Sequence, residues 1–129
     1  MRYSWLLYIF LTFNSCYQVE RNCDNFKAGE FEFNYVIDGQ MRKGRFIRTE
    51  TLNIDYYEGK VDSATVRWIN DCEYILKKIN PKSNAEKDAI HIKILSTDGN
   101  SSYTFEYKLA VKKPNRPLQV ERGTAYRIN

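Results

Sequence analysis

The sequence contains little of what enzymes use for acid–base or nucleophilic chemistry. Its 129 residues include a single histidine, His91. Alternation along the surrounding segment turns that side chain away from its isoleucine neighbours, toward solvent or a ligand. No G-x-S-x-G elbow, phosphate-binding glycine loop or H-E-x-x-H pair is present. The chain is therefore expected to be non-catalytic and to need no cofactor.

Long hydrophobic stretches are also missing. The main apolar run, from Trp5 to Phe13, has about nine residues, whereas a helix that crosses a bilayer needs about 20. The run follows a short positive start, Met1-Arg2, and is followed by polar residues. This layout is typical of the apolar region of a secretory signal.

Cys16 closes the apolar run, and the small residue Ser15 precedes it. Bacterial lipoprotein signals have the same layout: cleavage precedes the cysteine, which then carries acyl chains and anchors the protein. We expect a signal peptide over 1–15, a lipid-anchored tether over 16–22 and one β domain over 23–129. An ordinary cleaved signal and a hydrophobic first strand are the alternatives. Nothing acidic directly follows Cys16, so the expected location is the periplasmic face of the outer membrane.

Two cysteines remain if Cys16 is acylated, namely Cys23 and Cys72. In an oxidising compartment an even pair favours a disulfide, which here would close a loop of about fifty residues. The alternative is two free thiols, with Cys72 packed as a small hydrophobic residue.

Alternation with a period of two recurs along the rest of the chain and predicts strands. Asp38-Gly39 and Glu58-Gly59 are typical of hairpin turns, and the stretch 80–88 could hold a helical turn. The expected strands are 31–37, 45–49, 52–57, 64–68, 72–76, 90–94, 103–111 and 124–128. About eight short strands predict an all-β fold: an antiparallel meander forming a strongly curved sheet or a small lipocalin-like barrel. A β-sandwich is the alternative.

Charged residues suggest neither nucleic acid nor metal as a partner. The formal net charge is only +4, too mild to indicate nucleic-acid binding. Basic residues gather in two groups, which we interpret as solvated strand edges that prevent edge-to-edge pairing, with contact to anionic lipids or glycans as the alternative. The groups are Arg42, Lys43, Arg45 and Arg48, and Lys112, Lys113 and Arg116. Asp55, Glu58 and Asp62 are expected at turns and edges, because their spacing fits no calcium loop.

Three segments resemble a known family. The run from Cys23 to Phe31 is similar to the C-x-x-F-K-x-G-x-F opening of a family of small lipoproteins from flavobacterium-type bacteria (Bacteroidota). The run from Val66 to Tyr74, with its W-x-x-D-C-E-Y block, and the ending 122–128 resemble two further parts of that family. Each of the first two segments contains one cysteine, so the resemblance supports pairing Cys23 with Cys72. The family has no established function. Some members carry a DNA topoisomerase IV label, which a chain of this size with an export signal does not support.

These expectations leave two classes of function. The first is a non-catalytic binding or interaction module, tethered to the membrane by its lipid anchor and joined to an envelope protein. The second is a carrier that holds a small apolar ligand among tyrosine and phenylalanine side chains. Eight short strands usually fill their interior with side chains, which favours the interaction module.

Overall fold

A computed structural model describes residues 19–129 and contains eight strands and two short 3₁₀ turns, η1 (Cys23–Phe26) and η2 (Ala85–Lys87). The expected signal peptide, the lipidation site Cys16 and the first part of the tether lie outside these residues. The strands are β1 (Gly29–Ile37), β2 (Gln40–Arg48), β3 (Leu52–Tyr57), β4 (Lys60–Asn70), β5 (Glu73–Lys78), β6 (Ile90–Asp98), β7 (Ser102–Leu109) and β8 (Glu121–Arg127). Among residues 19–129, no helix has the length and apolar composition needed to span a bilayer.

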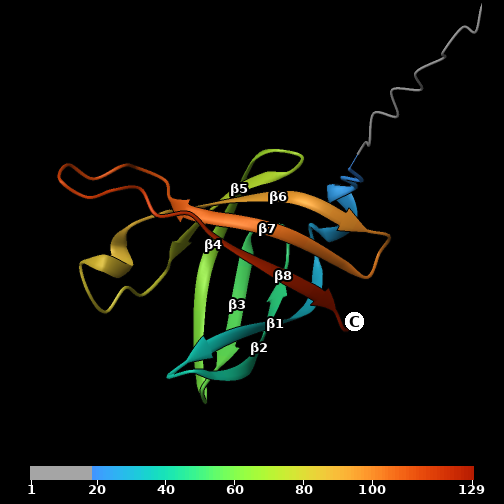
Figure 1. The fold of residues 1–129 in the computed structure, drawn as a ribbon, viewed down its shortest axis with the longest axis horizontal. Helices are drawn as coiled ribbons and strands as arrows, with labels where there is room; N and C mark the ends of the chain where they lie inside the picture. The colour runs from blue at the N-terminus through green and yellow to red at the C-terminus, as the bar shows by residue number, and fades with distance from the viewer. Residues whose placement is uncertain (1–18) are drawn as a thin grey trace, which may run out of the picture.

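The strands form one closed antiparallel barrel in sequence order (Figure 1). Each strand pairs with the next along the chain, and β8 returns to pair with β1 through Phe31–Arg127 and Phe33–Ala125. Closure leaves no free sheet edge. The expected all-β meander is therefore confirmed as a small barrel, and the sandwich alternative is wrong.

Tight turns join the strands where the sequence predicts them. Asp38 and Gly39 both have positive φ, 51° and 75°, and Glu58 and Gly59 repeat the pattern with 50° and 71°. Positive φ at both central positions defines the type I′ hairpin turn, whose twist matches that of the flanking strands. The stretch 80–88 holds the single turn η2, as expected.

Alternation along the strands sends one set of side chains into the barrel, and these fill one end of it completely. Phe31 and Ile94 are fully buried, and Tyr103 is 2% exposed. The packed cluster consists of Cys23, Phe26, Phe31, Phe46, Ile94, Tyr103 and Ala125. We call the end that contains this cluster the closed end.

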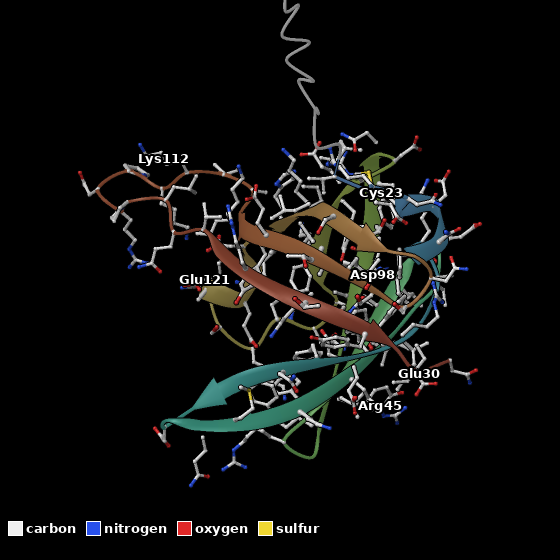
Figure 2. The ribbon with its side chains drawn as sticks, turned by 45° about the vertical axis from the view of Figure 1, so that its right-hand side comes forward. Cys23, Glu30, Arg45, Asp98, Lys112 and Glu121 are labelled. Carbon is white, nitrogen blue, oxygen red and sulfur yellow. A yellow bond between two sulfur atoms is a disulfide. The ribbon has the colours of Figure 1, made fainter. Side chains whose placement is uncertain are left out.

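The turn η1 covers the closed end. Phe26 from η1 inserts with no exposed surface, its ring 5.1 Å from that of Tyr103. A disulfide joins Cys23 in η1 to Cys72 in the β4–β5 turn, which confirms the expected pairing (Figure 2). From β8, the Arg127 guanidinium donates to the carbonyls of Asn25 and Asn100.

The segment before η1 is attached to the same end. The backbone N–H of Thr97 donates to the carbonyl of Glu20 at 2.8 Å, and the N–H of Asn22 donates to the Thr97 hydroxyl at 2.8 Å. Arg21 donates to the carbonyl of Ile94 at 3.0 Å. The described chain therefore enters the barrel at the closed end.

Candidate ligand-binding site

The opposite end of the barrel, which we call the open end, is hollow. It is bordered by the two hairpin turns, by the β5–β6 connection and by the β7–β8 connection (Figure 1). An interior cavity of about 240 Å³ reaches from this end down to Tyr74 and Tyr103. Its aromatic wall consists of Phe33, Tyr35, Phe46, Tyr74, Tyr103, Phe105 and Tyr107.

Two further hollows adjoin this cavity through Asp55, which lines all three. One, of about 250 Å³, lies toward η2 and shares Asp55 and Leu76 with the interior cavity. The other, of about 290 Å³, opens beside Tyr57 and Glu58 at the β3–β4 hairpin. Asp55 is thus the point at which the interior space and the mouth of the barrel meet.

Strand β3 presents its polar side to the interior, the reverse of the usual arrangement. Asn53 is 3% exposed and, with Asp55, lines the cavity, whereas Leu52 is 36% exposed. The register explains this reversal, because Arg48 pairs with Asn53 and the buried Phe46 pairs with Asp55. Directly paired residues share a face of the sheet, so the inward position of Phe46 fixes that of Asp55.

Asp55 lies directly opposite a second carboxylate, Asp62 on β4. Like charges in opposite positions destabilise a sheet. The negative charge of Asp62 is stabilised by two partners: the Tyr57 hydroxyl donates to the carboxylate at 2.5 Å, and the Lys78 ammonium lies 3.7 Å away. Lys78 also pairs with Glu86 at 2.7 Å.

The negative charge of Asp55 is stabilised much less than that of Asp62. Asn53 Nδ2 donates to its Oδ1 at 3.0 Å. Within the described part of the chain, no lysine or arginine nitrogen lies within 4.0 Å of Asp55. Burial, opposed by the Asn53 hydrogen bond and reinforced by the nearby Asp62, raises the pKa of Asp55 to about 6. The hydrogen bond from Tyr57 holds the pKa of Asp62 below its usual value.

Below the cavity, a buried arginine separates the hollow half from the filled half. Arg48 is 1% exposed, and its guanidinium donates to the Tyr74 hydroxyl at 2.6 Å and to the Phe26 carbonyl. Its central carbon lies 4.8 to 5.7 Å from the centres of five aromatic rings, those of Phe31, Phe46, Trp68, Tyr74 and Tyr103. Cation–π attraction of this kind grows stronger away from water. Burial raises the pKa of Tyr74 well above its ordinary value, so this phenol stays neutral.

The sequence-based interpretation of Arg48 and Asp55 is wrong, and so is that of Asp62, which was expected at a turn or edge but lies half-buried inside β4. Arg48 was expected on a solvated strand edge, but it is fully buried in the barrel. Asp55 was expected at a turn or edge, but it lies inside a strand and lines the cavity. The pairing of β2 with β3 would have identified the inward position of Arg48 and Asp55. Phe46 and Arg48 alternate on β2, and their partners on β3 are Asp55 and Asn53.

The other candidate residues lie away from the cavity. His91 lies on the outer face of β6, where its Nε2 is 3.1 Å from Glu73 Oε1. Five of the basic residues are exposed, as expected, but the closed barrel leaves no strand edge for them to protect; they are Arg42, Lys43, Arg45, Lys112 and Arg116. Glu58 is exposed in its hairpin turn. Among residues 19–129, no group of three or more histidine, cysteine or acidic side chains could hold a metal ion.

A larger groove, of about 510 Å³, lies at the mouth of the barrel beside the β7–β8 connection and shares Tyr107 with the interior cavity. Its border includes the exposed residues Arg116 and Leu118 and the half-buried Lys113. No fully buried polar side chain is among its lining residues. The interior cavity therefore has the stronger features of a ligand site, because a half-buried carboxylate and seven aromatic side chains meet there.

The fold and the cavity define a class of protein: a small antiparallel β-barrel that is filled at one end and hollow at the other. No family model, curated protein sequence or solved structure matches the chain.

Proposed function

We propose that this protein is a non-catalytic binding protein that holds a small molecule in the open end of its barrel. This is the carrier function, the second of the two classes that the sequence favours. The observation that carries the proposal is the interior cavity of about 240 Å³ beside Asp55. Eight short strands can fill their interior with side chains, yet here the filling stops at Tyr74 and Tyr103.

The polar face of β3 supports the same function. Placing Asn53 and Asp55 inside the barrel leaves Leu52 at the surface, which costs stability in two ways: a half-buried carboxylate and an exposed apolar side chain. Departures from the usual arrangement, in which apolar side chains face inward and charged ones outward, are expected at functional sites. A bound ligand would provide the partner that the Asp55 carboxylate lacks. The cavity is smaller than the 300–1,000 Å³ typical of drug-sized ligands, so the proposed ligand is small.

A lipid anchor at Cys16 and a periplasmic location complete the proposal. The segment Glu20–Asn22 is fastened to the closed end, so a tether there would leave the open end on the far side of the barrel from the attachment point. A ligand could then enter from the periplasm without obstruction by the anchor.

A second candidate function, attachment to an envelope protein, is favoured by the β7–β8 connection. This connection projects from the barrel (Figure 2), and Val111, Leu118 and Val120 on it are 75%, 41% and 48% exposed. Replacing Val111 and Leu118 with serine should abolish crosslinks to an envelope protein in intact membranes. The same variant should leave small-molecule binding unchanged.

Calorimetric titration of the full-length protein with 2-phenylethanol, a small neutral amphipathic probe, tests the carrier function. We expect saturable binding with one site per chain. Leu76→Trp would place an indole in the cavity and should abolish binding, whereas Ile75→Trp, on the outer face of the same strand, should leave it intact. Equal binding by both variants, or no binding by any neutral or charged probe of this size, would contradict the proposed function.

A further inference from the structure

We propose that the natural ligand is an organic ammonium ion, an amine on a small apolar body, whose charged group is bound by Asp55 and the aromatic rings around it. This inference rests on the proposed function and specifies its ligand. It follows from the charges and rings at the open end, taken in three steps.

The first step concerns charge. Five carboxylates line the two adjoining hollows, those of Asp55, Glu58, Asp62, Glu86 and Asp88, and one ammonium group, that of Lys78, lies among them. Lys78 is already engaged with Glu86 at 2.7 Å and with Asp62 at 3.7 Å. Asp88 pairs with Lys113 at 2.7 Å, and Glu58 is exposed in its turn, so Asp55 is the half-buried carboxylate whose charge lacks a close counterpart.

The second step concerns the other cations nearby. Arg48 lies below the cavity, with its guanidinium committed to Tyr74 and Phe26. Arg122 borders the cavity but is exposed, and in the sheet it pairs with Glu106. Neither arginine provides Asp55 with an ion pair, since no arginine nitrogen in the described part of the chain comes within 4.0 Å of it.

The third step concerns the rings that flank Asp55. Phe33 and Tyr35 from β1 and Tyr57 from β3 line the same hollow as Asp55. The rings of Phe33 and Tyr35 are 5.8 Å apart, and those of Tyr35 and Tyr57 meet edge to face at 6.5 Å. Aromatic faces attract organic cations, and a carboxylate adds a charge-assisted hydrogen bond to a primary ammonium.

Other ligand classes fit this site less well. An anionic ligand would meet Asp55 and Asp62 with like charge. A divalent metal ion needs several oxygen ligands, and residues 19–129 contain no such group. A neutral ligand would leave the Asp55–Asp62 repulsion in place. An organic ammonium relieves that repulsion while its apolar body occupies the aromatic-lined cavity.

The pH dependence of amine binding provides a second test of the ammonium assignment. Because burial raises the pKa of Asp55 to about 6, a bound ammonium should lower it again and release a proton near that pH. The other charged groups around Asp55 are Arg48 below the cavity and those that line the three hollows: Glu58, Asp62, Lys78, Glu86, Asp88 and Arg122. The affinity for an amine should therefore rise as the pH increases from 5 to 7 and then level off.

The test compares three probes that carry a phenyl ring on a short chain: 2-phenylethylamine, 2-phenylethanol and 3-phenylpropanoate. Titrated into the full-length protein at pH 7.5, the amine should bind at least tenfold more tightly than the alcohol, and the carboxylate more weakly than either. Asp55→Asn, which keeps the shape of the side chain, should lower the affinity for the amine to that for the alcohol. The matched control Glu106→Gln, on the outer face of β7, should change neither.

The outcomes separate this inference from the proposed function. Binding of the alcohol as tightly as the amine, in the unmutated protein, would overturn the ammonium assignment while leaving the cavity as a ligand site. Unchanged affinity for the amine in Asp55→Asn would overturn it as well. Failure of all three probes would contradict the ligand site itself.

Discussion

The two ends of the barrel are built from the same eight strands but differ in what occupies the interior. At the closed end, Phe26, Phe31 and Ile94 have no exposed surface, and a disulfide holds η1 in place. At the open end, Tyr107 is 38% exposed and the space beside Asp55 is unfilled. Packing to the density of a crystal stabilises a fold, whereas an open cavity with a half-buried, unpaired carboxylate costs stability.

This difference indicates that the two ends have different roles: the closed end stabilises the fold, and the open end binds the proposed ligand. The closed end provides the stability that lets the open end keep an unfavourable arrangement, the opposed carboxylates of Asp55 and Asp62. Arg48 lies at the boundary, since it contacts Phe26 on one side and Tyr74, which lines the cavity, on the other. Substitutions at the closed end should therefore change stability, and those at the open end should change binding and pH dependence.

The largest effect is expected from Arg48→Ala. The change removes the donors to Tyr74 and Phe26 and leaves a cavity among five rings, so we expect a loss of about 5 kcal/mol in the free energy of unfolding. Arg48→Met, which keeps most of the volume without the charge, should cost much less. Urea denaturation measures both. A loss below about 1 kcal/mol for Arg48→Ala would show that this arginine does not hold the closed end together.

The second-largest loss of stability is expected from removal of the disulfide. Cys23 and Cys72 are 49 residues apart in sequence, and closing a loop of this length stabilises a fold by about 4 kcal/mol in the chain-entropy model. The double variant Cys23→Ser/Cys72→Ser should melt at a lower temperature than the unmutated protein and be insensitive to reductant. An unchanged melting temperature of the unmutated protein in reductant would rule out a stabilising role for this bond.

The third expected effect is on the pH dependence of the free energy of unfolding, which Asp55 at the open end controls. Its folded-state pKa of about 6 exceeds its ordinary value of 3.8, so between these values the folded protein keeps a proton that the unfolded chain loses. The associated stability is complete below pH 3.8 and is lost as the pH rises through 6, by up to roughly 3 kcal/mol. Asp55→Asn should remove this decline. Chemical denaturation at pH 4, 5, 6 and 7 measures it, and parallel profiles for the two proteins would contradict the assignment.

The smallest effect is expected on the outer surface. Arg45 and Glu30 form an ion pair at 2.6 Å, with side chains 47% and 25% exposed (Figure 2). Exposed pairs of this kind contribute between zero and about 1 kcal/mol. Glu30→Gln should therefore change the free energy of unfolding by less than about 1 kcal/mol, in the same urea titrations. A larger loss would mean that the outer face contributes to stability as the closed end does.

Much of the fold is predictable from the sequence because each strand carries its own alternation. Tyr103, Phe105 and Tyr107 alternate along one predicted strand and all line the cavity, and the two hairpin turns lie at their predicted residues. The pairing of Cys23 with Cys72 follows from cysteine number and from the family resemblance. These features depend on local pattern, which single-sequence reasoning captures well.

The candidate site is not predictable in the same way, because it depends on register. On β3 the apolar residues Leu52 and Ile54 would be assigned to the core by pattern alone, yet Asn53 and Asp55 face inward. Only the pairing of Phe46 with Asp55 fixes this orientation, and pairing between strands is a non-local property. The anchor at Cys16 lies outside the described residues and stays a prediction.

The most direct test of the two-ended barrel is an amide NMR titration of the full-length protein with 2-phenylethanol. The account predicts chemical-shift changes concentrated at Asn53, Asp55 and Gly123, which line the cavity, with Phe26 and Ile94 of the closed end unaffected. Shifts confined to Lys113 and Leu118, in the groove beside the β7–β8 connection, or the absence of any shift would contradict the claim that the interior cavity is the binding site.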